Sequence, residues 1–527
     1  MSTRALSRRE FLRLAALAGA GGVAAACVAP APQPIKETVK ETVKETVVVE
    51  KVVTPTPPPP IVTAHGRVLP ADAAPLEKQV YYEGSSEPRH LDVPRDIYQA
   101  APVLNWGTEP LLRRDENQNL VPALAESWSP GPNAEYWDFV IRKDARWSDG
   151  VPITADDFVF TYRHLSDPNL DTPWVWYYYD IKGVKAHKEG KAGPEEVGVV
   201  ALDERTVRFY GEGPVPHLPA LLAYQATTPA PKHKAEKDPE HWADTAEGFV
   251  SCGPFKLVKW EHNKRMEWEP NPYYNGPHKP GIQRVVQLIG TADTVWFNAW
   301  LNRETDLVAI LQPAEVAFIR ADPKLNPLLH FFNNFQTAYL ALDTMNPPLN
   351  NLKLRQALSH AIDRVTLCTQ VMNGTRVPAY SMLPPGFPAY NPDLKSIQDY
   401  NVEKARELLA EAGYPNGKDS TGKQLEIEMF SNGRDPELEF VKDQWETNLG
   451  IKVNLQLLEN AVWGQKRAEH SMMVYKGPYE YDYLDPANML TALWRSTSEK
   501  GSPRHAWKND RFDELVTAAG HEVDQEK

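Results

Sequence analysis

Short apolar stretches recur through the middle of the chain and predict β-strands. The clearest run from Tyr136 to Ile141, Thr206 to Tyr210, Val285 to Ile289 and Ile451 to Leu457. They are rich in β-branched and aromatic residues, which favour a pleated strand over a helix. Turn-forming and polar residues separate them, as expected for strands that each cross a folded body once.

Longer stretches carry apolar residues at helical spacing. One predicted helix spans Asn351 to Met372, and its apolar face is formed by Leu354, Leu358, Ala361, Ile362 and Val365. A second spans Val402 to Ala412 and stops at Gly413. Thr154 and Asp157 have the spacing of a capping box that opens a third. Because helices and strands alternate without an internal repeat, the fold class is predicted to be α/β.

The first 27 residues have the layout of a bacterial export signal. Four arginines precede a short run of small apolar residues, which three alanines and Cys27 follow. Arg8 and Arg9 lie in a segment similar to the twin-arginine export motif. The alanines before Cys27 resemble the site at which bacterial lipoproteins are acylated, although Ala24 stands where leucine is usual. We therefore predict export, and a lipid anchor on Cys27.

Residues 28–75 are predicted to be a tether. A KETV repeat begins at Lys36, and a proline run ends at Pro60. Such a sequence lacks the apolar residues for a packed core, and its proline-rich part favours an extended chain. The pattern favours a stalk that holds a folded body away from a membrane surface.

Composition narrows the class of protein. The chain has 527 residues, of which 42% are hydrophobic and 24% charged, with a formal net charge of −13. This is typical of a globular protein rather than a multi-span membrane protein. The negative charge argues against a nucleic-acid partner, because phosphate contacts need a basic surface. Three cysteines are too few for a disulfide framework or a four-cysteine metal site.

The sequence contains none of the common catalytic or cofactor motifs. It lacks the GxxxxGK[ST] phosphate loop, HExxH, and a GxSxG with recognisable partners. We therefore expect neither an enzyme nor a bound cofactor or metal. A secreted hydrolase on a similar shell stays as a minor alternative.

Six segments, in order, resemble the bacterial extracellular solute-binding proteins of family 5, which serve oligopeptide and dipeptide ABC importers. The family pattern of an LAxxW segment followed by WsDGxPvTAxDf matches Asn119–Trp128 and Trp137–Phe160, and the remaining matches are Gly253–Trp260 with Glu269–Gly276, Leu340–Arg364, Asn401–Gly417, Gln444–Glu459 and Tyr481–Leu490. Together they cover nearly everything after Glu77. The resemblance implies a two-lobed clamshell that closes on its ligand. It places lobe one at 76–330, with an extra subdomain at about 115–215, and lobe two at 331–527.

The resemblance also implies a ligand site. In peptide-binding members an aspartate ahead of a DP pair meets the ligand's α-ammonium, and Asp482 holds that position. Tyr479 stands where the family usually has tryptophan, and Lys476 stands where some members have an arginine for the ligand's carboxylate. The other implied pocket residues are Tyr481, Asn460 and Trp463.

An alternative ligand is an oligosaccharide. Residues 174–179 hold five aromatic rings in six positions, and aromatic faces suit sugar rings. The same rings could instead fill the core of the extra subdomain. The aspartate at 482 favours peptides.

The implied partners are a peptide, an ABC permease with its separate ATPase, and a membrane reached through the lipid anchor. We expect a monomer on the outer face of the cell membrane or in the periplasm. A helix that starts at Phe512 is predicted to run to Lys527 without a stop signal. Family members continue beyond this point, so the chain is expected to end within lobe two and to leave apolar surface of lobe one uncovered.

Overall fold

The computed structural model describes residues 35–36, 52–53, 60–290, 293–332, 334–496 and 507–524. Two compact units divide the chain, one of residues 1–62 with 68–73 and one of residues 63–67 with 74–527. In the first, β1 (Ile35–Lys36) pairs antiparallel with β2 (Val52–Val53). Arg8, Arg9 and Cys27 lie outside the described residues, so the export motif and the lipid anchor stay predictions.

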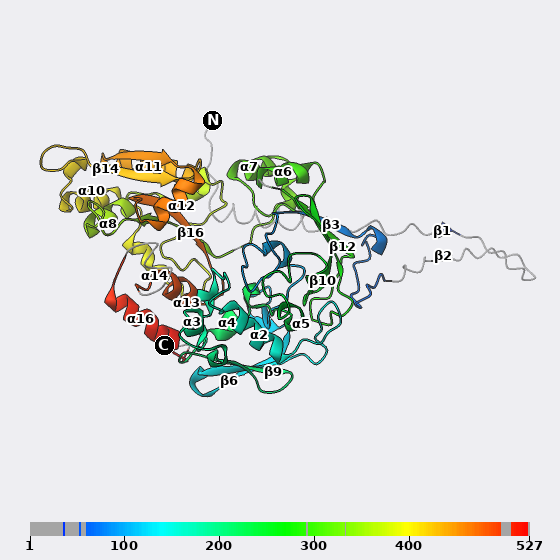
Figure 1. Cartoon of the computed structure of the whole chain (residues 1–527). Coiled ribbons are helices and arrows are strands. Elements are labelled where there is room, and N and C mark those ends of the chain that lie inside the picture. Colours follow the sequence, from blue (N-terminus) through cyan, green and yellow to red (C-terminus); the bar gives the residue numbers. More distant parts are fainter. Residues whose placement is uncertain are drawn as a thin grey trace, which may run out of the picture. The chain divides into compact units, whose positions relative to one another are not determined.

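The second unit contains three four-stranded sheets (Figure 1). The first has the order β10-β11-β12-β3, formed by β10 (Phe255–Glu261), β11 (Arg265–Pro270), β12 (Arg284–Ile289) and β3 (Val80–Ser85). Its last pair is parallel and the others are antiparallel. The parallel pair joins the start of the body to a strand about 200 residues later in the chain.

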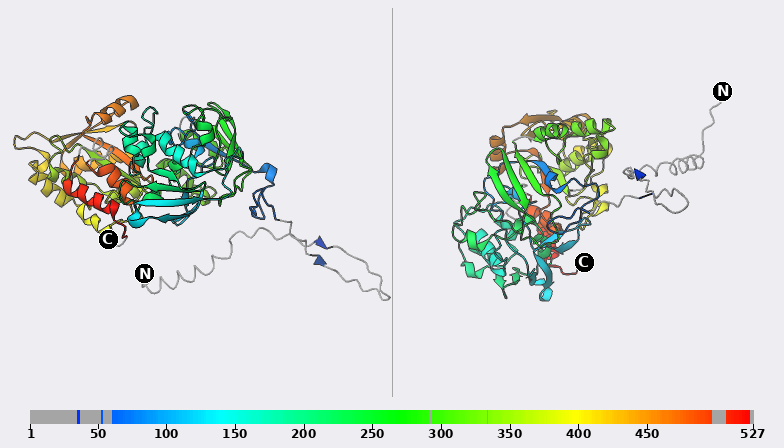
Figure 2. Two further views of the ribbon diagram at one scale, coloured as in Figure 1. Left: turned by 60° about the horizontal axis from the view of Figure 1, so that its bottom comes forward. Right: turned by 90° about the vertical axis from the view of Figure 1, so that its right-hand side faces the viewer.

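The second sheet is antiparallel throughout, with the order β6-β7-β9-β8. Its strands are β6 (Ala125–Pro130), β7 (Tyr136–Ile141), β9 (Thr206–Tyr210) and β8 (Val199–Ala201), drawn in cyan to green in Figure 2. Helix α2 (Ala155–Leu165) covers it and starts at the predicted capping box, where Asp157 Oδ2 accepts from Thr154 N at 2.8 Å. A small antiparallel pair, β4 (Leu112–Arg114) with β5 (Leu120–Pro122), precedes this sheet.

The third sheet has the order β13-β16-β14-β15. Its strands are β13 (Gln336–Leu342), β16 (Val474–Glu480), β14 (Glu426–Ser431) and β15 (Lys452–Leu457). The pair β13 and β16 is antiparallel, so Gln336, where the chain enters the sheet, lies opposite Glu480, where it leaves. The pairs of β14 with β15 and β16 are parallel.

Helices pack around these sheets. The longer ones are α6 (Asp293–Leu301), α7 (Pro313–Ala321), α8 (Leu352–His360), α10 (Val402–Glu411), α11 (Pro436–Leu449), α12 (Asn460–Ala468) and α16 (Asp510–His521). Shorter turns are α3 (Val184–Lys188), α4 (Leu218–Leu221), α5 (Lys232–Ala235), α9 (Arg364–Thr366), α13 (Pro486–Met489), α14 (Thr491–Trp494) and the 3₁₀ turn η4 (Val175–Tyr178). None of the described helices is long and apolar enough to cross a membrane.

The mixed α/β class and the four strands predicted from the sequence are confirmed, as is the helix beginning at Val402. The single helix predicted over Asn351 to Met372 is wrong. It ends at His360, whose carbonyl accepts from Asn401 N at 2.9 Å, and Asp363 then caps a new turn by accepting from Val365 N and Thr366 N. Val365, expected on the buried face, is 51% exposed.

The prediction that the last helix continues to Lys527 is also wrong. Helix α16 ends at His521, and Glu522 already has an extended backbone with ψ of 123°. Only Val516 of this helix is buried, so little packing holds a further turn in place.

Two large apolar cores support the body. One joins the first and second sheets and contains Trp147, Phe158, Phe209 and Trp268. The other lies between α8, α10, α11 and the third sheet. A smaller cluster lies where the chain passes into and out of the third sheet, and it includes Tyr479 and Tyr481, two of the predicted site residues.

Candidate functional site

Asp482 is held in the loop between β16 and α13. Its backbone N–H donates to Oδ1 of Asn488 at 2.8 Å, and Nδ2 of Asn488 donates back to Oδ2 of Asp482 at 3.2 Å. Asn488 is fully buried. Asp485 caps α13 by accepting from Ala487 N at 2.9 Å, which fixes Asn488 at this distance from the loop. The carboxylate is therefore positioned by its own local turn.

Tyr479 lies on the other side of the same loop, at the end of β16. Its hydroxyl is 3.0 Å from Oδ2 of Asp482 and 3.2 Å from the carbonyl of Asn488. The ring is 5% exposed, so this residue packs in the apolar cluster around Met489 and Leu493 as well as facing the carboxylate. Tyr479 thus contacts the predicted ligand-binding aspartate directly.

Three tyrosines from the first half of the chain reach the remaining oxygen of this carboxylate. Tyr177 of η4 donates to Oδ1 of Asp482 at 2.7 Å, and Tyr98 and Tyr224 donate to the same atom, each at 3.3 Å. The hydroxyls of Tyr98 and Tyr177 are themselves 3.1 Å apart. One oxygen is therefore surrounded by three phenols from segments far apart in sequence.

Aromatic rings form the wall behind these hydroxyls. The rings of Tyr98 and Trp174 meet edge to face at 4.5 Å between centroids, and Tyr177 meets Tyr224 in the same way at 5.7 Å. Trp174 donates through Nε1 to Asp96 at 3.0 Å, which fixes its ring. Tyr177 is 4% exposed, whereas Tyr98 is 50% exposed. The carboxylate thus lies at the edge of an aromatic cluster with one open side.

Burial and the charge of Asp482 act together on the phenols. Burial, reinforced by the nearby carboxylate, raises the pKa of Tyr177, Tyr224 and Tyr98 above the usual value. The hydroxyls therefore stay protonated at neutral pH and act as donors to the carboxylate. Burial and the same carboxylate also raise the pKa of Glu480.

Lys476 forms ion pairs within the third sheet and α11. Its ammonium pairs with Asp435, and with Glu437 at 2.8 Å. Burial alone would lower the pKa of Lys476, but these two carboxylates outweigh it and raise the pKa. Nε of Arg376 lies 3.5 Å from the other carboxylate oxygen of Glu437. A ligand carboxylate would have to displace at least one of these partners to reach Lys476.

Of the other three predicted residues, Tyr481 directly follows β16, and Asn460 and Trp463 both lie on α12. Tyr481 is half-buried, and its ring meets those of Phe335 and Phe387, each at 5.5 Å. Trp463 of α12 packs edge to face on Tyr475 at 5.5 Å. Asn460 is exposed and accepts from Asn432 at 3.0 Å.

The structure thus brings two of the six predicted ligand residues together, Asp482 and Tyr479. Tyr98, Tyr224 and Asn488 are not among the residues predicted from the sequence. Tyr177 lies in the predicted aromatic run, but that prediction rests on the rings and not on the hydroxyls. Asn488 carried no local signal, because its amide reaches back to Asp482, six residues earlier in the chain.

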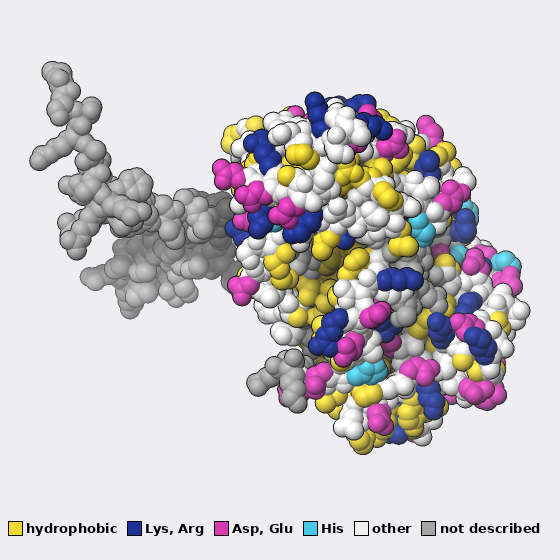
Figure 3. Space-filling view, turned by 90° about the vertical axis from the view of Figure 1, so that its left-hand side faces the viewer, with side chains coloured by type: hydrophobic (Ala, Val, Ile, Leu, Met, Phe, Trp, Pro, Cys, Tyr) yellow, Lys and Arg dark blue, Asp and Glu magenta, His cyan; other side chains and the backbone are white. Residues whose placement is uncertain are grey.

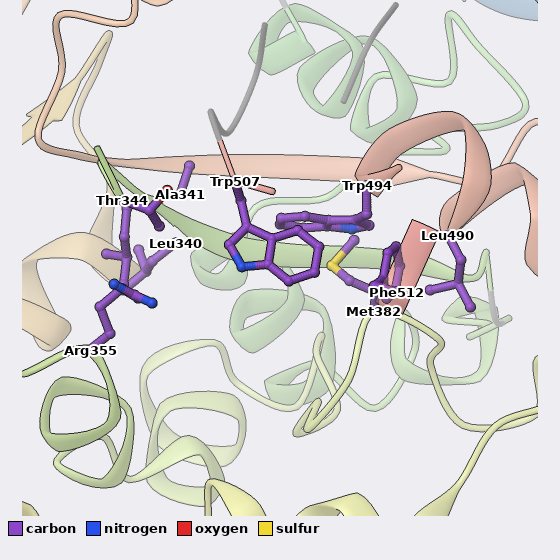
Figure 4. Close-up of a pocket in the computed structure, with 10 residues that line it drawn as sticks. Leu340, Ala341, Thr344, Arg355, Met382, Leu490, Trp494, Trp507 and Phe512 are labelled. Atoms are coloured by element: carbon purple, nitrogen blue, oxygen red, sulfur yellow. The ribbon is translucent and has the colours of Figure 1, made fainter. Parts of the chain in front are cut away.

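A separate apolar cavity of about 380 Å³ lies against β13. Figure 4 shows Thr344 and Arg355 at one end and Trp494, Met382 and Phe512 at the other. It shares no lining residue with the Asp482 site.

Figure 3 shows hydrophobic side chains gathered across the middle of the face that carries α8, α10 and α16.

The described residues contain no group of three or more histidine, cysteine, aspartate or glutamate side chains able to hold a metal ion. The chemistry of the Asp482 site is instead that of a carboxylate ringed by neutral donors. A carboxylate in such a place suits a cationic partner, because charge-assisted hydrogen bonds are about twice as strong as neutral ones.

Comparison with known proteins places this site in context. The periplasmic oligopeptide-binding protein OppA of Escherichia coli is 30% identical over 461 residues, covering 85% of this chain and 82% of that protein. The dipeptide-binding protein DppE of Bacillus subtilis is 25% identical over 461 residues, with coverage of 85% and 82%. The solved structure of the Escherichia coli murein tripeptide binding protein MppA superposes with a TM-score of 0.69 at 25% identity, covering 85% of this chain and 87% of that one.

These likenesses confirm the predicted two-lobed α/β fold. The description "Bacterial extracellular solute-binding proteins, family 5 Middle" matches residues 119–501, well over half of the sequence. The chain therefore belongs to family 5 of the bacterial extracellular solute-binding proteins.

Proposed function

We propose that this protein is the extracytoplasmic binding component of an ABC importer and that it captures peptides. The observation that carries the proposal is the Asp482 carboxylate, which is fixed by Asn488 and faces an aromatic cluster from the other half of the chain. The relatives described as oligopeptide- and dipeptide-binding proteins support the same ligand class.

In this proposal Asp482 receives the ligand's α-ammonium. A largely enclosed ammonium needs a carboxylate, and removing one partner of such a pair costs about 3–5 kcal/mol. That corresponds to a loss of roughly 100-fold or more in affinity. The peptide main chain is held by strand-like hydrogen bonds, which give affinity with little side-chain selectivity.

The remaining predicted residues take supporting roles. Tyr479 positions Asp482, and Tyr481 provides an aromatic wall beside it. Lys476 receives the carboxylate of a short ligand, which displaces Asp435 or Glu437 from the ammonium. Asn460 and Trp463 line the far end of the ligand. Each assignment rests on the family pattern and is open to substitution.

Delivery and location follow from the N-terminal sequence. The export signal takes the chain out of the cytoplasm, and the lipid on Cys27 with the tether to residue 75 keeps the body near a permease. Relatives named as periplasmic proteins support an extracytoplasmic location. A separate ATPase powers transport, and the protein itself, a monomer, binds its ligand without changing it.

Titration calorimetry with the tripeptide Ala-Ala-Ala tests the ammonium assignment. We expect Asp482→Asn to lose roughly 100-fold or more in affinity. Asp485→Asn is the matched control, because it neutralises a carboxylate three residues away while asparagine still caps α13. Equal affinity in wild type and Asp482→Asn would refute the assignment.

Native mass spectrometry of the purified protein tests the ligand class independently. Co-purified masses that fragment as peptides support the proposal. A series spaced by hexose units would instead make the protein an oligosaccharide binder. Release of shortened peptides during incubation would indicate a hydrolase.

A further inference from the structure

The Asp482 carboxylate already has as many donors as it can accept. Oδ1 accepts from Tyr98, Tyr177 and Tyr224. Oδ2 accepts from Tyr479 and Asn488. An ionised carboxylate offers about four lone-pair sites, and five side-chain donors lie within hydrogen-bond distance of them, so no site is left open. An incoming donor can reach Oδ1 only if a phenol leaves.

The two oxygens differ in where their donors come from. Tyr479 and Asn488 belong to the same stretch of chain as Asp482 and fix its loop. The three phenols on Oδ1 come from residues 98–224, far from Asp482 in sequence. Because they contact one oxygen and leave the loop's own bonds intact, they can be exchanged without dismantling the turn that holds the carboxylate.

We propose that Tyr98, Tyr177 and Tyr224 form a built-in competitor for the ligand, so that only a cationic end group displaces them from Oδ1. This inference rests on the proposed function and deepens it, because it names the side chains that set the ligand's charge requirement. The three residues act as specificity determinants by occupying the anionic atom that the ligand must reach.

The energetics follow from donor exchange. A neutral hydroxyl or amide that replaces a phenol on Oδ1 exchanges one neutral donor for another and gains little. An ammonium replaces the phenol with a charge-assisted bond, which is about twice as strong. The phenols cannot ionise and withdraw, because burial and the Asp482 charge keep them protonated. The competitor therefore lowers the affinity of every ligand, and neutral ligands then bind too weakly to be retained.

The test compares two ligands of nearly the same shape. Ala-Ala-Ala carries an ammonium, and lactoyl-Ala-Ala carries a hydroxyl in its place. Calorimetry on the full chain measures both against wild type, Tyr177→Phe and Tyr98→Phe. We expect Tyr177→Phe, which removes the shortest of the three bonds, to raise the affinity for both ligands by about tenfold. Binding of the hydroxyl ligand should then become measurable.

Tyr178→Phe is the matched control. Tyr178 is the next residue along η4 and equally buried, but its hydroxyl donates to the carbonyl of Ala226 at 2.8 Å and not to Asp482. This variant should bind both ligands as wild type does. Tyr98→Phe provides a second competitor variant at a half-exposed position, where loss of the hydroxyl leaves the core intact; we expect about a threefold rise.

The outcomes distinguish a failure of this inference from a failure of the proposed peptide-binding function. A fall in affinity for Ala-Ala-Ala in Tyr177→Phe or Tyr98→Phe would show that the phenols hold the ligand, and unchanged affinity would show that they are structural. Either result overturns the inference while Asp482→Asn still abolishes binding. If Asp482→Asn binds as wild type does, the ammonium assignment itself fails.

Discussion

Phe335 and Tyr481 meet edge to face, with ring centroids 5.5 Å apart, where the chain enters and leaves the third sheet. Phe335 directly precedes β13 and Tyr481 directly follows β16, and these strands are antiparallel neighbours. Phe335 has a φ of 51°, a left-handed conformation that bulky residues rarely adopt. Such strain persists only where the surrounding contacts hold the residue in place. Here the rings of Tyr481 and Phe387 pack against Phe335 and supply these contacts.

The packing of Phe335 is expected to stabilise the whole body. Phe335→Ala removes a ring that is 8% exposed, and we expect the free energy of unfolding to fall by about 3 kcal/mol. Phe332→Ala is the control, because that ring is 80% exposed and its loss should change stability by less than about 0.5 kcal/mol. Urea unfolding measures both. Equal effects of the two substitutions would show that the packing of Phe335 against Tyr481 and Phe387 does not stabilise the fold.

Two glycines with similar positive φ angles allow backbone strain to be measured separately from steric crowding of an added Cβ. Gly417 has a φ of +75°, and a Cβ there would lie 2.3 Å from the Gly450 carbonyl oxygen. Gly422 has a φ of +84°, with nothing within 4 Å of its Cβ position. We expect Gly422→Ala to cost about 1 kcal/mol from strain alone. Gly417→Ala should cost about 1–3 kcal/mol more. Thermal unfolding that gave the two variants the same midpoint would contradict this account.

The His217–Asp180 pair predicts a pH dependence of stability. Burial alone would lower the pKa of His217, but Asp180, whose Oδ2 is 3.0 Å from Nε2, outweighs burial and raises it. Burial alone would raise the pKa of Asp180, but the hydrogen bond from His217 and its charge outweigh burial and lower this pKa. Asp485 also faces His217, and Arg495 and His521 face Asp180.

A histidine with a raised pKa stabilises the fold fully below its unfolded pKa of about 6.5, and this is lost as the pH rises through the folded pKa. The Asp180 contribution is present above about pH 3.9 and is lost as the pH falls. We therefore expect the gap in unfolding free energy between wild type and His217→Gln to be larger at pH 6 than at pH 8. A gap that grew towards pH 8 would reverse the sign and refute the pairing.

The two described cysteines are expected to be unreactive. Burial raises the pKa of both Cys252 and Cys368 to about 11. At pH 8 roughly one thiol in a thousand is then ionised, and the thiolate is the reactive form. In a Cys27→Ser variant, Ellman's reagent should detect no thiol in the native protein and two after unfolding in guanidinium. A native thiol that reacts within minutes would show that one site is open.

Much of the fold could be predicted because its elements carry local signals. Thr206 to Tyr210 is a strand in sequence pattern and in structure, and the helix from Val402 stops one residue earlier than predicted. The break after His360 could not be predicted, because it depends on a hydrogen bond from Asn401, 41 residues later in the chain. The apolar periodicity continues through the break and gives no warning of it.

The site divides in the same way. Asp482 could be found because a family pattern carries it. Tyr98 and Tyr224 could not, because each looks like an ordinary aromatic residue and acquires a role only when the fold brings its hydroxyl to Oδ1 of Asp482. Asp485, directly before Pro486, caps α13 by accepting from Ala487 N, and an aspartate in that position is a local signal that a sequence does carry. Local chemistry is thus readable from sequence, whereas convergence of distant side chains is not.

The pairing of Gln336 with Glu480 makes the segment between them an insertion with adjacent ends. Directly opposed residues on antiparallel strands lie about 5 Å apart, so this segment, with its own apolar core, could be exchanged between relatives as a cassette. Asp482 lies two residues beyond the cassette, and all three of its phenol donors lie well before it in the chain. An exchange would therefore transfer Lys476 and Tyr479 to a new host but leave the preference for a charged amino end behind.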